Sequence, residues 1–446
     1  MTGALARYLR SFTGFGRDAR LFILTTIAFG AVLSLYWIDF NLYLEAIGLD
    51  RSTMGWLLAV SQLAGVVVAL PASALSNRVG RRALMAGGMA LVAVALFMFL
   101  PGDRALLFVG VAALGAGSQI VGVVQIPYIA EHTLPEQRNE YFAVWSALGF
   151  VTAVVSAIVG GAVASALAPI LGMHSAVAPY QVLLAGVAIL GLLSLATVFL
   201  LTSDRPAPDR ERPAGRGRFG LVVLDRRLFF RLLLPGFLTS LGAGQLIPFL
   251  NVFIENKFGL DLASINVFFA ITSLGTAAAI LIQPALASRF GRIGSIVLVQ
   301  GASIPFLVVL GFSPVLWTVV AALTVRNSLM NAGSPIFDAF SMERVSAAER
   351  ATLAAGMTLL WSLGWTIAPL YYSYLQATLG FTTGYAVNFI TIIVLYTTAT
   401  SLLWTWFRDT DRVAAREAAR EAATEPAPEL APDVIPAEAP PFLEHA

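Results

Sequence analysis

Residues 40–50, FNLYLEAIGLD, recur in the second half of the chain as residues 250–261, LNVFIENKFGLD. An offset near 211 residues also places residues 76–82, SNRVGRR, over residues 287–293, ASRFGRI. Both matches include charged or amide side chains, which a shared membrane composition does not bring into register. We infer that the two halves of the chain are copies of one unit.

A third match extends this register. Glu131 and Arg138 fall over Glu343 and Arg350 at an offset of 212 residues. The register therefore holds across three separate loops, which indicates that the duplication covers most of each half.

The composition places both copies in a lipid bilayer. Of the 446 residues, 58% are hydrophobic and 12% are charged, whereas soluble chains carry about 25% charged residues. The mean hydropathy is +0.79. We therefore expect an all-α membrane protein with twelve transmembrane helices in two six-helix, pseudo-symmetric halves. A spanning helix needs about 20 apolar residues, and the runs of suitable length lie near 21–46, 54–75, 84–101, 105–130, 141–167, 180–202, 229–254, 264–287, 295–312, 316–342, 352–376 and 385–407.

The positive charges indicate which loops face the cytoplasm. With a cytoplasmic N-terminus, 24 of the 28 Lys and Arg residues fall in cytoplasmic segments, as the positive-inside rule requires. We therefore expect an inner-membrane protein with both termini in the cytoplasm. The expected segments are a cytoplasmic N-tail at 1–20, six-helix bundles at 21–202 and 229–408, a cytoplasmic linker at 203–228, and a cytoplasmic disordered tail at 409–446.

The residue inventory excludes several classes of site. The sequence has no cysteine and only three histidines, His132, His174 and His445, which are too scattered for a metal cage. It has no Gly-Lys-Ser nucleotide-binding loop, so ATP hydrolysis is not the energy source. The net charge of +2 gives no reason to expect nucleic-acid binding. Because no nucleophile, base and metal ligand cluster in the helices, we expect no enzyme activity, no cofactor and no metal.

The loop after the second expected helix carries a specific motif. Residues 73–82, SALSNRVGRR, resemble the signature of the major facilitator superfamily, which reads Gly, three residues, Asp, Arg, any, Gly, any and two basic residues. Ser73 replaces the glycine and Asn77 replaces the aspartate, so the family's acid contact to helix 11 would be dipolar here. The family's element of Glu, six residues and Arg matches the third repeat above. The resemblance spans residues 20–408 and implies two six-helix halves around a central site.

Loop residues form the candidate cytoplasmic gate. Glycines in the repeated loops permit tight reversals, and the arginines beside them can bridge to carboxylates at neighbouring helix ends. The alternative is that the arginines only enforce topology. The expected gating network comprises Asn77, Arg78, Gly80, Arg81, Glu131, Arg138, Arg289, Gly291, Arg292, Glu343 and Arg350.

Asp39 and Arg326 are charged residues inside apolar runs, where a charge costs at least about 2.5–3.5 kcal/mol and marks function by default. Counted from the helix ends, they lie about 10 and 15 Å deep at a rise of 1.5 Å per residue, so they can be level. One interpretation is a central site in which Asp39 takes up a proton or pairs with Arg326, while Arg326 attracts an anionic group. The alternative is a structural ion pair.

Other polar and aromatic residues complete the candidate site. The resemblance implies that helices 1, 4, 7 and 10 line the cavity, and two tryptophans on helix 11 can stack a ring-bearing substrate. The alternative is that the glutamine and asparagine side chains on these helices only form hydrogen bonds between helices, and that the tryptophans only fill the packed interior. We expect Glu255 and Asp338 to lie in water. Besides Asp39 and Arg326, the candidate substrate and proton site comprises Tyr36, Tyr43, Gln119, Gln125, Gln245, Asn251, Asn327, Asn331, Trp361 and Trp365.

These patterns predict a secondary transporter that moves a small organic molecule across the inner membrane by alternating access. Proton-coupled export is favoured, since one buried carboxylate suffices for a proton. Residues 156–161, SAIVGG, match half of the family's antiporter signature and add slight support for antiport. The alternatives are an uptake carrier for a sugar or an organic anion, and a lipid flippase. The expected partners are a small-molecule substrate, the proton and membrane lipid, without nucleic acid, and we expect a monomer.

Overall fold

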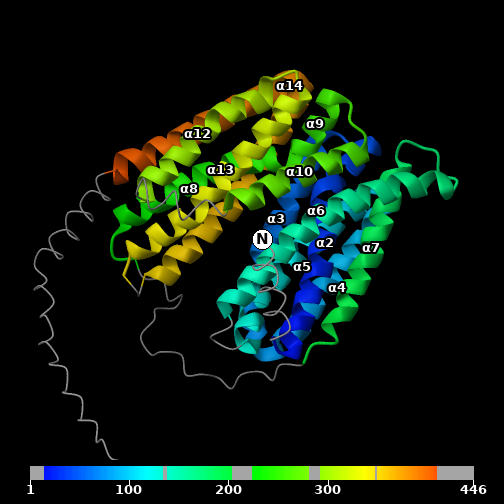
Figure 1. The fold of residues 1–446 in the computed structure, drawn as a ribbon, viewed down its shortest axis with the longest axis horizontal. Coiled ribbons are helices and arrows are strands. Elements are labelled where there is room, and N and C mark those ends of the chain that lie inside the picture. Colours follow the sequence, from blue (N-terminus) through cyan, green and yellow to red (C-terminus); the bar gives the residue numbers. More distant parts are fainter. Residues whose placement is uncertain (1–14, 134–137, 203–222, 281–291, 347–348, 409–446) are drawn as a thin grey trace, which may run out of the picture.

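The computed structural model describes residues 15–133, 138–202, 223–280, 292–346 and 349–408. Within these ranges every regular element is a helix. Figure 1 shows the helices in two groups, one built from the N-terminal half of the chain (blue to green) and one from the C-terminal half (green to red). The all-α fold and the division into two halves follow the sequence prediction.

The N-terminal half contains six helices whose starts and turns follow local chemistry. The Asp50 carboxylate caps its helix by accepting from Thr53 N at 2.8 Å, and Asp103 caps its helix by accepting from Leu106 N at 3.0 Å. Gly80 turns the chain with a φ of 91°, which favours glycine. The six helices are α2 (Arg17–Ala46), α3 (Arg51–Val79), α4 (Arg81–Phe99), α5 (Arg104–His132), α6 (Arg138–Ile170) and α7 (Ala178–Val198).

The C-terminal half departs from the expected helix boundaries in two places. The seventh helix was expected to be continuous over 229–254, but it is interrupted by a short 3₁₀ turn, η2, around Pro248. Proline has no N–H and clashes with the preceding turn, so the α-helical ladder cannot pass through it unchanged. This half contains α8 (Arg226–Leu246), η2 (Ile247–Phe249), α9 (Leu250–Phe258), α10 (Leu262–Ile280), α12 (Arg292–Phe312), α13 (Leu316–Glu343) and α14 (Arg350–Phe407).

The second departure is α14, which joins the eleventh and twelfth expected helices. Gly380, at φ 69° and ψ −171°, is the one non-helical residue within α14, where it reverses the chain. Nine helices of the described part are long and apolar enough to cross a membrane, and two shorter apolar helices lie at Leu262–Gly275 and Leu316–Met330. With α14 divided at Gly380, these elements give twelve crossing helices in two sets of six.

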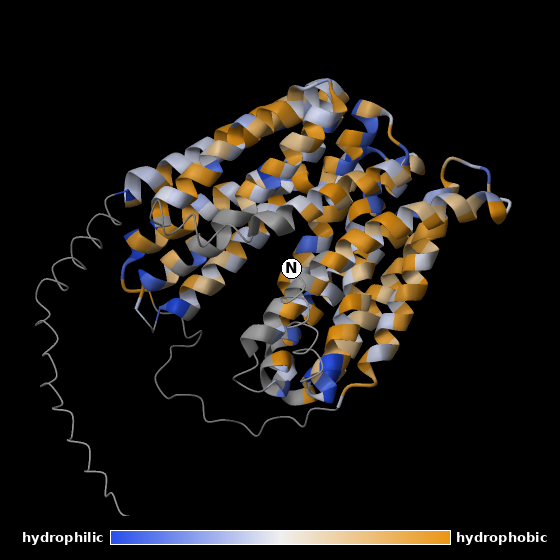
Figure 2. Ribbon diagram, viewed as in Figure 1, coloured by the Kyte–Doolittle hydropathy of each residue, from blue (hydrophilic) through white to orange (hydrophobic). Residues whose placement is uncertain are grey.

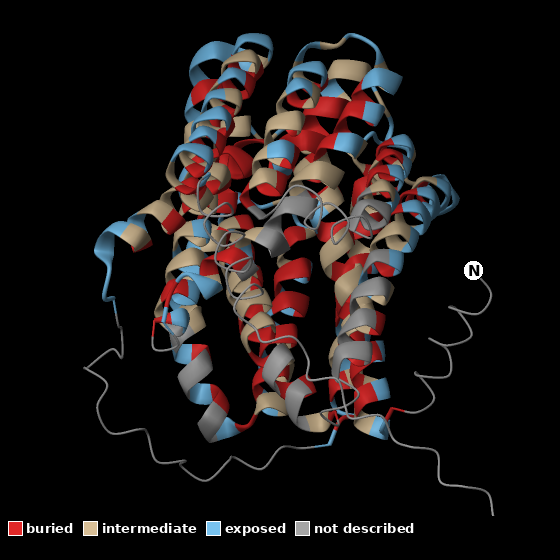
Figure 3. Cartoon of the chain, turned by 60° about the vertical axis from the view of Figure 1, so that its left-hand side comes forward, coloured by how far each residue is buried: buried red, intermediate tan, exposed pale blue. Residues whose placement is uncertain are grey.

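The surface of the molecule is suited to lipid. Figure 2 shows apolar residues along the outward faces of the helices, and Figure 3 shows that exposed residues cover those faces while buried residues lie between the helices. Large apolar side chains are exposed there, including Val67, Leu274 and Trp317, the last at 71%. Contiguous exposed apolar area of this kind is typical of a membrane-embedded protein.

The two ends of the bundle differ in their connections. At one end lie the short connections 47–50, 100–103, 171–177, 259–261 and 313–315, and we call it the hairpin end. At the other end Thr202 Oγ1 donates to Asp18 Oδ1 at 3.0 Å, and we call it the linker end because the chain there leaves the first half.

Candidate functional site

Two asparagines join the halves toward the hairpin end. Asn41 of α2 donates its amide N–H to the Pro248 carbonyl in η2, and Asn251 of α9 donates to the Ile38 carbonyl in α2. The internal repeat places Ile38 over Pro248 just as it places Asn41 over Asn251. The two bonds therefore exchange under the pseudo-two-fold axis, and we call this reciprocal pair the asparagine clasp.

Further polar contacts surround the asparagine clasp. Arg51 Nη2 donates to Glu45 Oε1 at 2.6 Å and to Asn256 Oδ1 at 2.9 Å, and Asn256 Nδ2 donates to Glu45 Oε2 at 2.9 Å. Tyr180 of α7 donates its hydroxyl to Glu255 Oε1 of α9 at 2.9 Å. Glu255, which was expected in water, is half-buried and bonds across the two halves. These contacts close the hairpin end.

Asp39 lies within this closed region. Its side chain is 2% exposed, and its Oδ1 accepts a hydrogen bond of 2.7 Å from Asn266 Nδ2 of α10, in the opposite half. Gly161 of α6 makes room for this contact, because a Cβ there would lie 2.9 Å from Asn266 Nδ2. The carboxylate of one half is therefore held by an amide of the other.

Arg326 lies inside the C-terminal half. Its side chain is 1% exposed, its Nη1 donates to Asn327 Oδ1 at 3.0 Å, and its Nη2 donates to the Tyr396 hydroxyl at 3.1 Å. Among the described residues neither Asp39 nor Arg326 takes part in an ion pair. The ion pair that the sequence offered as one alternative is thus not formed in this state. A buried cation without an anionic partner is costly, so Arg326 remains a functional candidate.

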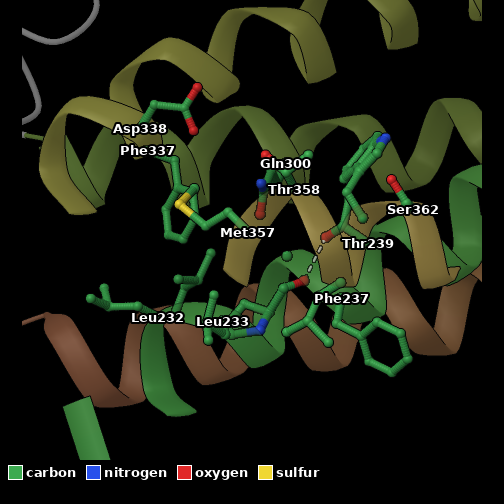
Figure 4. A pocket seen from close by; sticks show the side chains of 15 residues that line it. Leu232, Leu233, Phe237, Thr239, Gln300, Phe337, Asp338, Met357, Thr358 and Ser362 are labelled. Atoms are coloured by element: carbon green, nitrogen blue, oxygen red, sulfur yellow. Dashed lines mark hydrogen bonds between the residues drawn. The ribbon is translucent and has the colours of Figure 1, made fainter. Parts of the chain in front are cut away.

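A cavity of about 380 Å³ opens in the C-terminal half between α8, α12, α13 and α14 (Figure 4). Small-molecule sites typically enclose about 300–1,000 Å³. In Figure 4 Met357 lies centrally among the lining side chains, and Asp338, which is exposed, lies at their edge. The wall combines apolar and polar side chains: Leu232, Leu233, Phe237, Phe337, Met357, Leu360 and Trp361 with Thr239, Gln300, Thr358 and Ser362.

Three indole rings run from the N-terminal half to this cavity. Trp37 of α2 meets Trp365 of α14 edge to face, with ring centroids 6.1 Å apart. Trp365 in turn lies 6.4 Å from Trp361, which lines the cavity and is 45% exposed. Of the two helix 11 tryptophans, Trp361 therefore lines the cavity, and Trp365 connects it to the N-terminal half.

Two expected site residues lie in the core of the N-terminal half. The Tyr36 ring packs against Phe40 with centroids 4.8 Å apart, and Tyr43 donates its hydroxyl to the Phe99 carbonyl at 2.8 Å. Tyr36 is 5% exposed and Tyr43 is 1% exposed. In this state they support α2 and do not line the cavity.

The expected amides are dispersed. Gln245 is 3% exposed and donates to a carbonyl of its own helix at 3.1 Å. Gln119 and Gln125 are half-buried on α5, and Asn327 is half-buried beside the Arg326 guanidinium. The side chain of Asn331 lies outside the described residues.

Much of the expected gating network also falls outside the described residues. Gly80 forms the tight reversal, and Arg81, which starts α4, is half-buried. At the linker end of the C-terminal half, Glu343 ends α13 and is exposed, while Arg350 Nε donates to the Met342 carbonyl at 3.0 Å. Outside the description lie Arg289 and Gly291 and the side chains of Asn77, Arg78, Glu131, Arg138 and Arg292.

Glu349 is a linker-end residue that sequence reasoning missed. It accepts from Leu224 N at 2.7 Å and from Ser346 Oγ at 2.8 Å, which ties the start of α8 to the start of α14. The backbone N–H of Leu224, and next the Ser346 hydroxyl, lower the pKa of this carboxyl below its usual value. Glu349 is therefore ionised at neutral pH.

Asn266, Trp37 and Tyr396 are the other contacts that sequence reasoning missed. Asn266 is the one amide in the otherwise apolar, Ser- and Thr-containing helix α10, which is the signal that was available. Trp37 adjoins the expected polar face of α2 but points toward the other half. Nothing in the local sequence marks Tyr396, since its partner Arg326 lies 70 residues away.

Comparisons with known proteins agree with this architecture. The profile of the Major Facilitator Superfamily matches residues 21–369 and 232–441. A bacterial homologue of the human lysosomal transporter Spinster, inward-facing and occupied, has a TM-score of 0.68 and 15% identity over 87% of this chain and 96% of its own. No curated protein sequence matches the chain.

Two further solved structures have the same fold. The nucleoside transporter NupG has a TM-score of 0.68 and 13% identity over 87% of this chain and 99% of its own. A bacterial homologue of the iron transporter ferroportin, inward-facing, has a TM-score of 0.69 and 15% identity over 87% of this chain and 98% of its own. At these identities the neighbours show the fold alone, whereas the sequence profile covers both halves. The chain belongs to the Major Facilitator Superfamily and is a multi-pass membrane transporter.

Proposed function

We propose that this transporter moves a small organic molecule across the inner membrane by alternating access. The observation that carries the proposal is a hairpin end at which the asparagine clasp joins the two halves, combined with a ligand-sized cavity nearer the linker end. A carrier that exposes its site to one side at a time needs such a division. Both termini and the linker face the cytoplasm, as the distribution of positive charge supports.

The coupling ion in this proposal is the proton, and the direction is export. Asp39 is the proton carrier, because a buried carboxylate that lacks a cationic partner is stabilised by binding a proton. Its contact with Asn266 spans the two halves, so its charge state can bias their relative position. A proton that enters from the hairpin end would then be exchanged for a substrate molecule that leaves through the same end.

The substrate in this proposal occupies the cavity beside Trp361. The apolar wall and the scattered hydroxyl and amide groups suit an amphipathic molecule with a ring that stacks on the indole. Arg326 lies on α13, which also lines the cavity, and supplies a positive charge that an anionic group of the substrate would approach once the Tyr396 and Asn327 contacts loosen. The loop arginines and glutamates at the linker end form the opposite gate.

Flux in vesicles tests the proposal directly. The purified protein is screened by thermal shift against drugs, sugars and organic anions, and ligands that raise the melting temperature are tested for transport with an imposed pH gradient. We expect gradient-driven accumulation by the native chain and its loss in Asp39→Asn, with downhill counterflow retained. Full accumulation by Asp39→Asn would remove this residue from coupling.

Labelling tests the orientation, because the native chain has no cysteine. A single cysteine at Ser175, which is exposed at the hairpin end, should react with an impermeant thiol reagent from outside the cell. One at Thr202 should react only from the cytoplasm. The reversed pattern would invert the proposed topology.

A further inference from the structure

The Asp39 and Asn266 side chains each leave one buried oxygen without a hydrogen-bond partner. Among the described residues no donor reaches Asp39 Oδ2 or Asn266 Oδ1. Both residues are deeply buried, at 2% and 0% exposure. A buried polar atom without a partner is destabilising, so two of them on this one bonded pair of residues require an explanation.

The orientation of the Asn266 amide follows from its other contact. Its Nδ2 donates both to Asp39 Oδ1 at 2.7 Å and to the Leu262 carbonyl at 3.0 Å. A flipped amide would point its oxygen at these two acceptors, so the nitrogen belongs where it is. The two oxygens that remain can bond to each other only if one of them carries a hydrogen.

Among the described residues no cation contacts Asp39, and the charged groups around it are engaged elsewhere. Its own helix carries Tyr36, Tyr43 and Glu45, and Glu45 is paired with Arg51. From α7, Tyr180 lies within electrostatic reach of Asp39 and bonds to Glu255 of α9. From α9, Lys257 is engaged with the Gly311 carbonyl at 2.9 Å. Residues 142–170 of α6 and the whole of α10 contain no ionisable side chain.

We propose that Asp39 and Asn266 together form a proton-binding site in which a proton on Asp39 Oδ2 is donated to Asn266 Oδ1. The acid and the amide then share two antiparallel hydrogen bonds, and all four polar atoms are satisfied. Asn266 is the positioning residue, and Gly161 provides the space it occupies. The inference rests on the proton coupling proposed above and assigns its second partner.

The chemistry is a simple proton exchange. When the halves part, water reaches Asp39, the O–H bond breaks heterolytically, and the proton passes to that water; the reverse step reprotonates the carboxylate. Closing on the ionised acid would bury an uncompensated charge and lose one cross-half bond. The protonated pair therefore holds the hairpin end closed, and rising pH favours its opening.

The internal repeat provides a matched control. The offset of 211 residues places Asn266 over Gly55, and the offset of 212 places Ser373 over Gly161. In the structure the Ser373 Oγ lies 1.8 Å from the position that a Cβ on Gly55 would take. The same hydroxyl donates to the Ser52 carbonyl at 2.8 Å. At each of these two helix–helix contacts a glycine of the N-terminal half meets a polar side chain of the C-terminal half. Among the residues described at the two contacts, an ionisable group is present only beside Asn266.

Spin-label distances test the proposal on the full chain in lipid nanodiscs. Labels at cysteines replacing Ser175 and Val315, which are exposed at the hairpin end in opposite halves, report the open-to-closed ratio by pulsed electron resonance. For the native sequence we expect this ratio to rise with pH. In Asp39→Asn two amides complete both bonds without a proton, so the ratio should be low and independent of pH.

The remaining variants separate the site from general weakening. Asn266→Leu removes both bonds of the acid–amide pair, so it should raise the open fraction roughly thirtyfold at low pH. It should also move the midpoint of the pH dependence, because the carboxyl stays buried but loses its hydrogen-bond partner. Ser373→Ala loses one bond across the halves, so it should raise the ratio about fivefold at every pH and leave the pH dependence unchanged. Gly161→Ala displaces Asn266 and should behave as Asn266→Leu does, which preserves the test if the leucine variant does not fold.

Infrared difference spectra give a readout that needs no transport. A protonated-carboxyl band that disappears in Asp39→Asn and moves in Asn266→Leu is expected, whereas an unmoved band or unchanged pH dependence in Asn266→Leu would overturn the acid–amide site. If that site is present while vesicle flux ignores the pH gradient, the proposed coupling fails and the proton site stands.

Discussion

Removal of the asparagine clasp should shift the protein away from its closed hairpin end by an amount that the contacts define. Asn41→Ala and Asn251→Ala each delete one bond between the halves. Hydrogen bonds between helices in membranes average about 0.6 kcal/mol, and typical protein bonds contribute about 1 kcal/mol. The double variant should therefore lose about 1–2 kcal/mol, which raises the open-to-closed ratio roughly five- to thirtyfold.

The reciprocal geometry sharpens this prediction. The two donors use different acceptors, so the single effects should add. Asn251→Ala should be the larger of the two, because Asn251 is 3% exposed and also accepts from Val252 N at 2.9 Å, whereas Asn41 is half-buried. Asn256→Ala provides the control, since this exposed asparagine contacts Glu45 at the same interface and exposed polar pairs contribute little.

The measurement is the hairpin-end distance distribution in nanodiscs for the native chain, both single variants, the double variant and Asn256→Ala. Equal shifts for Asn256→Ala and the double variant would refute the role of the clasp, because burial would then have no influence. A strongly non-additive double variant would refute the assignment of two independent bonds.

Three other outcomes follow from the described contacts. Glu349→Gln should lower the melting temperature at pH 7 and not at acid pH. A carboxyl whose pKa is lowered by folding stabilises the fold at pH values above its unfolded pKa of about 4.3, and it loses this contribution as the pH falls through its folded pKa. An equal decrease in melting temperature at all pH values would exclude the ionised bond to Leu224. Gly380→Ala should destabilise by about 1–3 kcal/mol in thermal melts, because φ 69° with ψ −171° is a backbone conformation essentially restricted to glycine and the site is otherwise open, so the cost is backbone strain alone; no change would mean that the turn relaxes. Trp361→Ala should weaken binding of a ring-bearing ligand in titration calorimetry about tenfold, as expected for a lost aromatic contact of about 1.5 kcal/mol, whereas Trp317→Ala on the exposed surface should not.

The sequence predicted the fold well because its signals are periodic and repeated. Apolar runs of spanning length and a register carried by Asn41 and Asn251 fix twelve helices in two copies. The break at Pro248 was harder to foresee, because proline in a membrane helix is often accommodated by neighbours. Here it produces a 3₁₀ turn whose carbonyl the other half uses.

The site was predicted only in part because depth along a helix does not give direction around it. Asp39 and Arg326 can be level, yet Arg326 faces Tyr396 inside its own half while Asp39 faces Asn266 across the interface. Tyr36 and Tyr43 share a face with Asp39 in the periodic pattern, but the two tyrosine side chains contact Phe99 in their own half. Contacts of this kind depend on which helices cross, which a single sequence does not specify.

The asparagine clasp also bears on how such a chain can arise. A contact in which each partner gives what the other receives is isologous, and a six-helix unit carrying one asparagine makes it twice simply by pairing head to head with its own copy. Fusion of two copies then inherits a closed hairpin end without further change. The helix–helix contacts at Gly55 and Gly161, by contrast, are no longer equivalent. A serine packs on Gly55, whereas an asparagine that bonds to an aspartate packs on Gly161. Equivalent surfaces hold a dimer together, whereas a direction of transport requires that the two copies diverge.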